Sequence, residues 1–164
     1  MIHIFTTGGT IEGIDCPDSE DVPGTVSAPI DNFLKTANVL FPYILERAFQ
    51  KDSRTITSGD RKILLEKIKN SSNGKILITH GTYTMAKTAS YLGQANLQKT
   101  IVLVGSFILG SSDYSDVPFN LGYAISSLEF LKPDVYIAMN GTIFHWNNVA
   151  KNLETNRFER KNEY

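Results

Sequence analysis

Short apolar runs alternate with longer segments of mixed polarity along the chain. Four runs are rich in β-branched and aromatic residues, which is typical of strands buried inside a sheet. A fifth run alternates apolar and polar residues and holds Pro42 near its start, which predicts an edge strand. The buried strands are expected at residues 2–5, 75–79, 100–104 and 134–139, and the edge strand at 41–49.

The segments between these strands carry helix signals. Apolar residues recur at helical spacing in each of them. Thr57 with Asp60 resembles a capping box, and Asp116 is a plausible N-cap with Pro118 in the first turn. Helices are therefore expected at 30–38, from about 58 to Asn73-Gly74, at 85–92 before Gly93, and from 117 to about Leu131.

Strands that alternate with helices at this spacing predict an α/β fold with a doubly wound, mostly parallel sheet of about five strands and helices on both faces, as in flavodoxin-like domains. We expect one domain over residues 1–154, followed by a polar, frayed tail at 155–164. Residues 14–28 lack periodicity and are rich in Asp, Ser, Pro and Gly. They fit either an active-site flap or a surface excursion.

Composition narrows the function classes. The chain has 164 residues and a formal net charge of -1, so nothing favours a nucleic-acid or anionic-membrane partner. Cys16 is the only cysteine, which excludes an internal disulfide and a cysteine-based zinc site, and the three histidines lie far apart, so no metal is expected. The sequence has no apolar run of membrane length and no basic signal region, and we expect a cytoplasmic protein.

Two threonines stand where an open α/β sheet places its chemistry. Thr10 follows the first strand and the Gly8-Gly9 turn, where backbone can lie against a ligand without an intervening Cβ. Thr82 lies between the strand at 75–79 and the next helix, close to free backbone N–H groups. Thr10 fits a nucleophile if a base removes its proton, and it equally fits a structural residue of a tight turn.

Three segments read together resemble the bacterial-type L-asparaginases, amidohydrolases that use threonine. They are TTGGTI at 6–11, ITHGTYTM at 78–85, and the stretch from Met139-Asn140 to Lys151-Asn152. The resemblance spans nearly the whole chain but only the family's larger amino-terminal domain, so we expect a short, single-domain form.

The resemblance implies roles for individual residues. Thr10 matches the nucleophile that attacks the side-chain amide carbon, and Thr82 matches a second threonine in contact with Lys151, which serves as the base. Ser53 matches the residue that holds the substrate's α-carboxylate. The reaction implied is hydrolysis of asparagine, and of glutamine as a second substrate, to ammonia and the acid, without metal or cofactor. The substrate-binding residues expected are Gly9, Ser53, Arg54, Gly81 and Ser106.

Each role has a simpler alternative. Lys151 also fits a solvated lysine, Ser53 a strand-end cap, and His80 a packed support inside the motif. The role of Asn120 stays open. Family members form dimers and tetramers, so the resemblance also predicts a homodimer or higher homo-oligomer.

Tyr83 departs from the family pattern, because it stands at the position of a catalytic aspartate that binds the substrate's α-ammonium group. A phenol carries no negative charge at neutral pH. Arg54, where many relatives have a small polar residue, adds a positive charge at the same end of the substrate. Three functions stay open: an asparaginase of low activity, a hydrolase of a related amide without a free α-amino group, and a non-catalytic binding or regulatory protein.

Overall fold

One six-stranded sheet with the order β2-β1-β3-β4-β5-β6 forms the centre of the computed structural model, which describes residues 1–14 and 28–161. The first five strands in this order are parallel, and β6 pairs antiparallel to β5. The expected doubly wound α/β fold is thus confirmed, with one antiparallel strand added at the edge. The strands are β1 (Ile2–Thr6), β2 (Tyr43–Arg47), β3 (Lys75–Thr79), β4 (Thr100–Val104), β5 (Asp134–Met139) and β6 (Thr142–His145).

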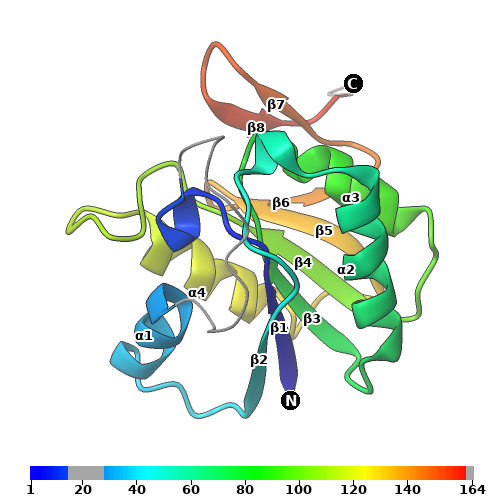
Figure 1. Ribbon diagram of the computed structural model, residues 1–164, viewed down its shortest axis with the longest axis horizontal. Helices are drawn as coiled ribbons and strands as arrows, with labels where there is room; N and C mark the ends of the chain where they lie inside the picture. The colour runs from blue at the N-terminus through cyan, green and yellow to red at the C-terminus, as the bar shows by residue number, and fades with distance from the viewer. Residues whose placement is uncertain (15–27, 162–164) are drawn as a thin grey trace.

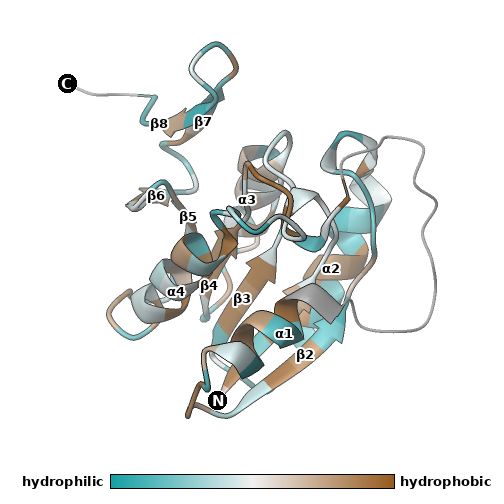
Figure 2. Cartoon of the chain, turned by 90° about the vertical axis from the view of Figure 1, so that its left-hand side faces the viewer, coloured by the Kyte–Doolittle hydropathy of each residue, from teal (hydrophilic) through white to brown (hydrophobic). Residues whose placement is uncertain are grey.

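Helices cover both faces of this sheet (Figure 1). Two lie on one side, α1 (Ala28–Thr36) and α4 (Val117–Ser127), and two on the other, α2 (Ser58–Asn70) and α3 (Met85–Gly93). Figure 2 shows the central strands β3 and β4 in the brown of apolar residues, as expected for strands covered on both faces.

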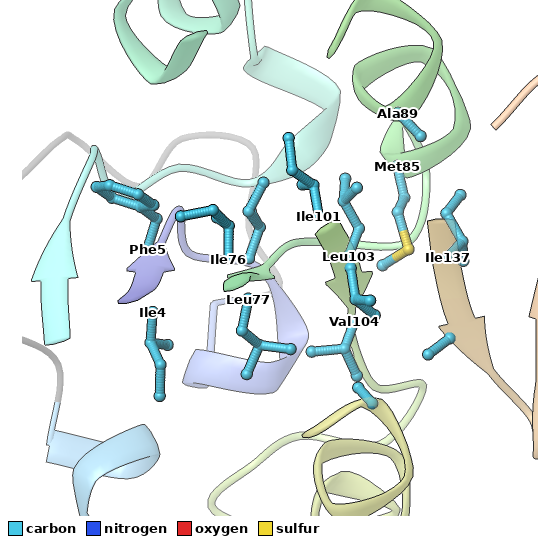
Figure 3. Packing of buried hydrophobic residues seen from close by; sticks show 14 of the residues in the cluster. Ile4, Phe5, Ile76, Leu77, Met85, Ala89, Ile101, Leu103, Val104 and Ile137 are labelled. Atoms are coloured by element: carbon cyan, nitrogen blue, oxygen red, sulfur yellow. The ribbon is translucent and has the colours of Figure 1, made fainter. Parts of the chain in front are cut away.

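The core forms two layers, one on each face of the sheet. Side chains of adjacent residues on a strand point to opposite faces. In Figure 3, Phe5 and Ile76 point toward the side of α3, whereas Ile4, Leu77 and Val104 point toward α1 and α4. All five side chains are fully buried. This packing fixes where the strands end, and therefore where the loops of the candidate site begin.

Three helices end earlier than the sequence indicates, and the first of them, α1, ends at Thr36. The Thr57–Asp60 capping box is confirmed. The helix that it starts, α2, ends at Asn70, where the Ser71 backbone N–H donates to the carbonyls of Lys67 and Ile68. The helix α4 ends at Ser127, and tighter turns continue to Leu131. The edge strand β2 is shorter than the alternating run that predicts it.

The carboxyl-terminal segment is more ordered than its polar sequence indicates. Two short strands, β7 (Ala150–Asn152) and β8 (Arg157–Glu159), form an antiparallel hairpin above the carboxyl ends of the parallel strands (Figure 1). The ring of Phe158 is 5% exposed and packs near Phe107 and Phe144. The expectation of a frayed tail from residue 155 is wrong over this strand. The hairpin carries Lys151 to the rim of the sheet.

Among the described residues, 1–14 and 28–161, no helix has the length and apolar character needed to cross a membrane. The candidate flap at 14–28 falls almost entirely outside these residues.

Candidate active site

Two glycines bring the first and third strands' loops into direct contact. Gly9 has φ 81° and ψ -177°, a backbone conformation open essentially only to glycine. A Cβ on Gly9 would lie 2.4 Å from Gly81 Cα and 2.5 Å from Gly81 N. The backbones therefore touch at this point, one residue before Thr10 and one before Thr82. Thr10 opens a short 3-10 turn, η1 (Thr10–Glu12), and is half-buried.

Thr82 and Lys151 are distant in the sequence but form a hydrogen-bonded pair. Lys151 Nζ donates to Thr82 Oγ1 at 2.9 Å, although the two residues are 69 positions apart. Thr82 is 4% exposed and Lys151 is half-buried. The contact expected between these residues is confirmed. A lysine held on a threonine hydroxyl in a partly dry site is a candidate base.

The pKa of Lys151 lies below its ordinary range. Burial is the larger cause, because it disfavours the charged ammonium, and the positive charge of Arg54 adds to it. Both effects raise the share of neutral lysine, the form that can accept a proton.

Tyr83 packs against both of these cations. Its ring, half exposed, lies 4.1 Å from Lys151 Nζ and 4.8 Å from the Arg54 guanidinium carbon. Such cation–π contacts contribute about 0.5–1 kcal/mol each at exposed sites. The structure thus brings Tyr83, Arg54 and Lys151 together with Thr82.

Asp52 fixes the position of Arg54. One oxygen of its buried carboxylate accepts from the Arg54 backbone N–H and Nε, at 2.8 and 2.9 Å, and the other accepts from Nη2 at 2.7 Å. These hydrogen bonds hold the pKa of Asp52 below its ordinary value. The side chain of Asp52 was not among the site residues that the sequence indicates; its place two positions before Arg54 was the available signal.

Ser53 and Ser106 are both buried. Ser53 starts the 3-10 turn η2 (Ser53–Thr55) and is 2% exposed. It lies so close to Gly81 that a Cβ added to Gly81 would be 2.8 Å from Ser53 Oγ. Its carbonyl accepts from Thr84 Oγ1 at 2.6 Å. Ser106 is 1% exposed, and its hydroxyl has no hydrogen-bond partner within the part of the chain that the structure describes. The structure therefore places Ser53 beside the glycine contact and Ser106 in the loop after β4.

His80 is a structural residue. It is fully buried, its Nδ1 lies 2.7 Å from the Gly81 carbonyl, and its Nε2 lies 2.9 Å from Thr88 Oγ1. Burial lowers the pKa of His80 to about 4, so the imidazole is neutral at neutral pH. The expectation of a packed, hydrogen-bonded support fits these contacts.

Asp116 orders the loop after β4. It precedes α4 as expected, but its side chain makes no capping hydrogen bond to that helix. Its carboxylate accepts instead from the Phe107 and Ile108 backbone N–H groups and from Asn120 Nδ2. Asn120 also donates to the Gly105 carbonyl at 3.2 Å. These contacts give Asn120 a structural role, in holding the segment that carries Ser106.

Glu12 is a site-shaping residue that sequence reasoning missed. Its carboxyl is 5% exposed, and Oε2 accepts the Gly8 backbone N–H and lies 3.4 Å from Thr79 Oγ1. Burial raises the pKa of Glu12. Glu12 thus braces the glycine turn from below. An acidic residue three positions after the Gly8-Gly9 turn, in an otherwise uncharged segment, was the signal that could have indicated this role.

Comparisons with known proteins match nearly the whole chain. The sequence profile described as "Asparaginase, N-terminal" matches residues 1–162. The glutaminase-asparaginase of Acinetobacter glutaminasificans is 34% identical, over 96% of this chain and 52% of its own length. L-asparaginase 2 of Escherichia coli is 26% identical over 94% of this chain and 47% of its own length. The chain thus spans about half the length of these relatives.

Solved structures show the same fold. A probable cytoplasmic L-asparaginase from Campylobacter jejuni superposes with a TM-score of 0.82 and 28% identity, covering 99% of this chain and 53% of its own. The thermostable L-asparaginase from Thermococcus kodakarensis gives a TM-score of 0.81 and 25% identity, covering 97% and 50%.

Proposed function

The chain belongs to the asparaginase family, whose amino-terminal domain it matches, and from that premise we propose that it is an amidohydrolase that releases ammonia from a carboxamide through Thr10. The observation that carries the proposal is the hydrogen bond from Lys151 to Thr82, one residue beyond the contact between Gly9 and Gly81. That contact supports a position of Thr10 close to the same pair.

The reaction requires a nucleophile, a base and a place for the developing negative charge. In this proposal Thr10 Oγ1 attacks the carboxamide carbon, and neutral Lys151 accepts the proton through the Thr82 hydroxyl. The Lys151 ammonium returns this proton to the amide nitrogen, ammonia leaves as the C–N bond breaks, and water then hydrolyses the ester on Thr10. Backbone N–H groups near Gly9 and Thr82 stabilise the oxyanion. The lowered pKa of Lys151 supports its role as the base, since more of it is neutral at a given pH.

The proposed binding residues surround this unit. Gly9 and Gly81 lack the Cβ atoms that would hold the two loops apart, and this keeps the loops that carry Thr10 and Thr82 in contact. Ser53 and Ser106 bind the carboxylate end and the amide, and Arg54 and Tyr83 form the rim. L-asparagine and L-glutamine are the first substrates to test, as the names of the relatives indicate.

A non-catalytic role is the second candidate, and Tyr83 is the observation that favours it. Its bulky, half-exposed ring lies directly over the ammonium of Lys151, where it shields the proposed base. In that case the pocket would bind an amide without cleaving it.

Ammonia release separates these functions. We expect release from carboxamides at neutral pH with the unaltered protein, none with Thr10→Ala, and partial release with Thr10→Ser, which keeps a hydroxyl. Ammonia at the same rate from Thr10→Ala would refute the proposal, and binding without release would favour the second candidate.

We further propose a cytoplasmic homodimer or higher homo-oligomer. The similarity to the probable cytoplasmic L-asparaginase from Campylobacter jejuni supports the location. Light scattering of the purified protein measures the assembly, and a monomeric mass would contradict it.

A further inference from the structure

The Thr82–Lys151 pair borders a pocket of about 790 Å³, which is lined by Tyr83 and Lys151 on one side and by α2 and α3 on the other. This volume is in the range that holds ligands larger than a single amino acid. The pocket is therefore a candidate extension of the proposed active site.

The charged side chains that line this pocket are all basic. They belong to Arg61, Lys87, Lys151 and Lys161, and no Asp or Glu lines it among residues 1–14 and 28–161. Hydroxyl donors are interspersed with them, from Thr57, Ser58, Ser90 and Tyr91. Several cations around one concave surface favour an anionic ligand and disfavour a cationic one.

Arg61 gives this pocket a built, buried cation. Its guanidinium is 3% exposed and donates to Thr88 Oγ1 and to the carbonyls of Ile56 and Thr57. Its Nη2 has no hydrogen-bond partner within the described chain. A buried guanidinium nitrogen without an acceptor is costly, and an anion bound in the pocket that Arg61 lines would compensate its charge.

Tyr83 controls charge at the junction between pocket and base. Its ring makes cation–π contacts with Arg54 and Lys151, and it adds no negative charge to the site. Both oxygens of the nearby Asp52 carboxylate are used by Arg54. A substrate ammonium group at this junction would therefore meet positive charge.

From these charges we infer that the proposed amidohydrolase acts on anionic carboxamides that lack a free ammonium group next to the amide-bearing chain and that place a carboxylate in the basic pocket. The inference rests on the proposed function and names its substrate class. The chemistry is unchanged: the amide C–N bond is hydrolysed, ammonia leaves, and water supplies the new carboxylate oxygen.

Four amides test this substrate class by the kcat/KM for ammonia release at low ionic strength. L-asparagine carries the ammonium, succinamate lacks it, N-acetyl-L-asparagine blocks it, and N-succinyl-L-asparagine adds a carboxylate. We expect the kcat/KM of succinamate and of N-acetyl-L-asparagine to exceed that of L-asparagine by about tenfold or more, because close like charges disfavour binding of the ammonium. We expect N-succinyl-L-asparagine to exceed the acetyl compound, and its advantage to fall with added salt.

A charge reversal locates the effect in the pocket. Lys87→Glu, on the exposed pocket rim, should raise the KM for N-succinyl-L-asparagine several-fold and leave the acetyl compound nearly unchanged. Lys132→Glu, also exposed and just before β5 at the opposite end of the sheet, makes the same charge change and should alter neither.

The outcomes separate the two levels of the account. Preference for L-asparagine over its blocked forms, or equal effects of the two lysine variants, overturns the inference and leaves the proposed function standing. Release from none of the four amides above the Thr10→Ala blank overturns the proposed function, and the inference with it.

Discussion

The contact between Gly9 and Gly81 sets the distance between the two threonine loops, and Gly9→Ala tests it. A Cβ at Gly9 would lie 2.4 Å from Gly81 Cα and 2.5 Å from its nitrogen, both backbone atoms that cannot rotate away. The substitution therefore has to separate the loops that carry Thr10 and Thr82.

Two contributions give the expected magnitude. Forcing alanine into the Gly9 conformation costs about 1–3 kcal/mol. Overpacking against fixed backbone adds roughly 1–3 kcal/mol. We expect Gly9→Ala to lower the free energy of unfolding by about 2–6 kcal/mol, a large share of the roughly 5–15 kcal/mol of a typical domain.

Gly13 provides the matched control. It also has positive φ, 82°, but a Cβ there meets no atom of the described residues, 1–14 and 28–161, within 4 Å. Gly13→Ala should cost only the left-handed backbone strain, about 1–2 kcal/mol. Gly81→Ala tests the steric part alone, because it has no positive φ and its Cβ would lie 2.8 Å from Ser53 Cβ and Oγ.

Urea unfolding followed by circular dichroism measures these differences, and ammonia release at a temperature where all variants are folded measures the loop separation. We expect Gly9→Ala to lose both stability and activity, and Gly13→Ala to retain activity. Equal stability losses in Gly9→Ala and Gly13→Ala would refute the close approach of the two loops.

Three further predictions concern ionisable groups. Lys151→Met should lower kcat by a factor of about 10²–10⁴. It should also remove the increase of activity that the unaltered protein shows as the pH rises through the lowered pKa of Lys151. An unchanged pH–rate profile would contradict the assignment of Lys151 as the base. The folded protein holds His80 neutral, so the contribution of His80 to the free energy of unfolding should be fully present above its unfolded pKa, near 6.5. The free energy of unfolding should then fall by about 3 kcal/mol as the pH decreases to about 4. Urea titrations at several pH values measure this loss, which should be absent from His80→Gln. Glu12→Ala leaves the Gly8 N–H without its acceptor and should lower the free energy of unfolding by about 1–3 kcal/mol. Because burial raises the pKa of Glu12, the stability that this residue contributes is fully present below its unfolded pKa and is lost as the pH rises through its folded pKa. Glu12→Gln should remove that pH dependence.

The sequence predicts most closely those elements that local chemistry determines. The strands β3, β4 and β5 have the predicted bounds, because continuous apolar runs end at polar or glycine residues. The Thr57–Asp60 capping box is likewise a contact between residues three positions apart.

Features that depend on distant packing were harder to predict. The strand β8 lies in a polar segment in which Phe158 is the single apolar residue, and its burial depends on Phe107 and Phe144 from other parts of the chain. The contact between Lys151 and Thr82 was predicted from a family resemblance and not from spacing, since 69 residues separate them. The stacking of Tyr83 on two cations and the burial of Glu12 follow from the folded geometry alone.

Covalent attachment of substrate to Thr10 is the direct test of Thr10 as the nucleophile. Excess protein is mixed with a carboxamide that gives ammonia release, quenched in acid over a time series, digested, and analysed by mass spectrometry. We predict an acyl adduct on the peptide that holds Thr10. The adduct forms with ammonia release, then decays, and is absent from Thr10→Ala. Ammonia release without any adduct at Thr10, or with an adduct on the Thr82 peptide, would contradict it.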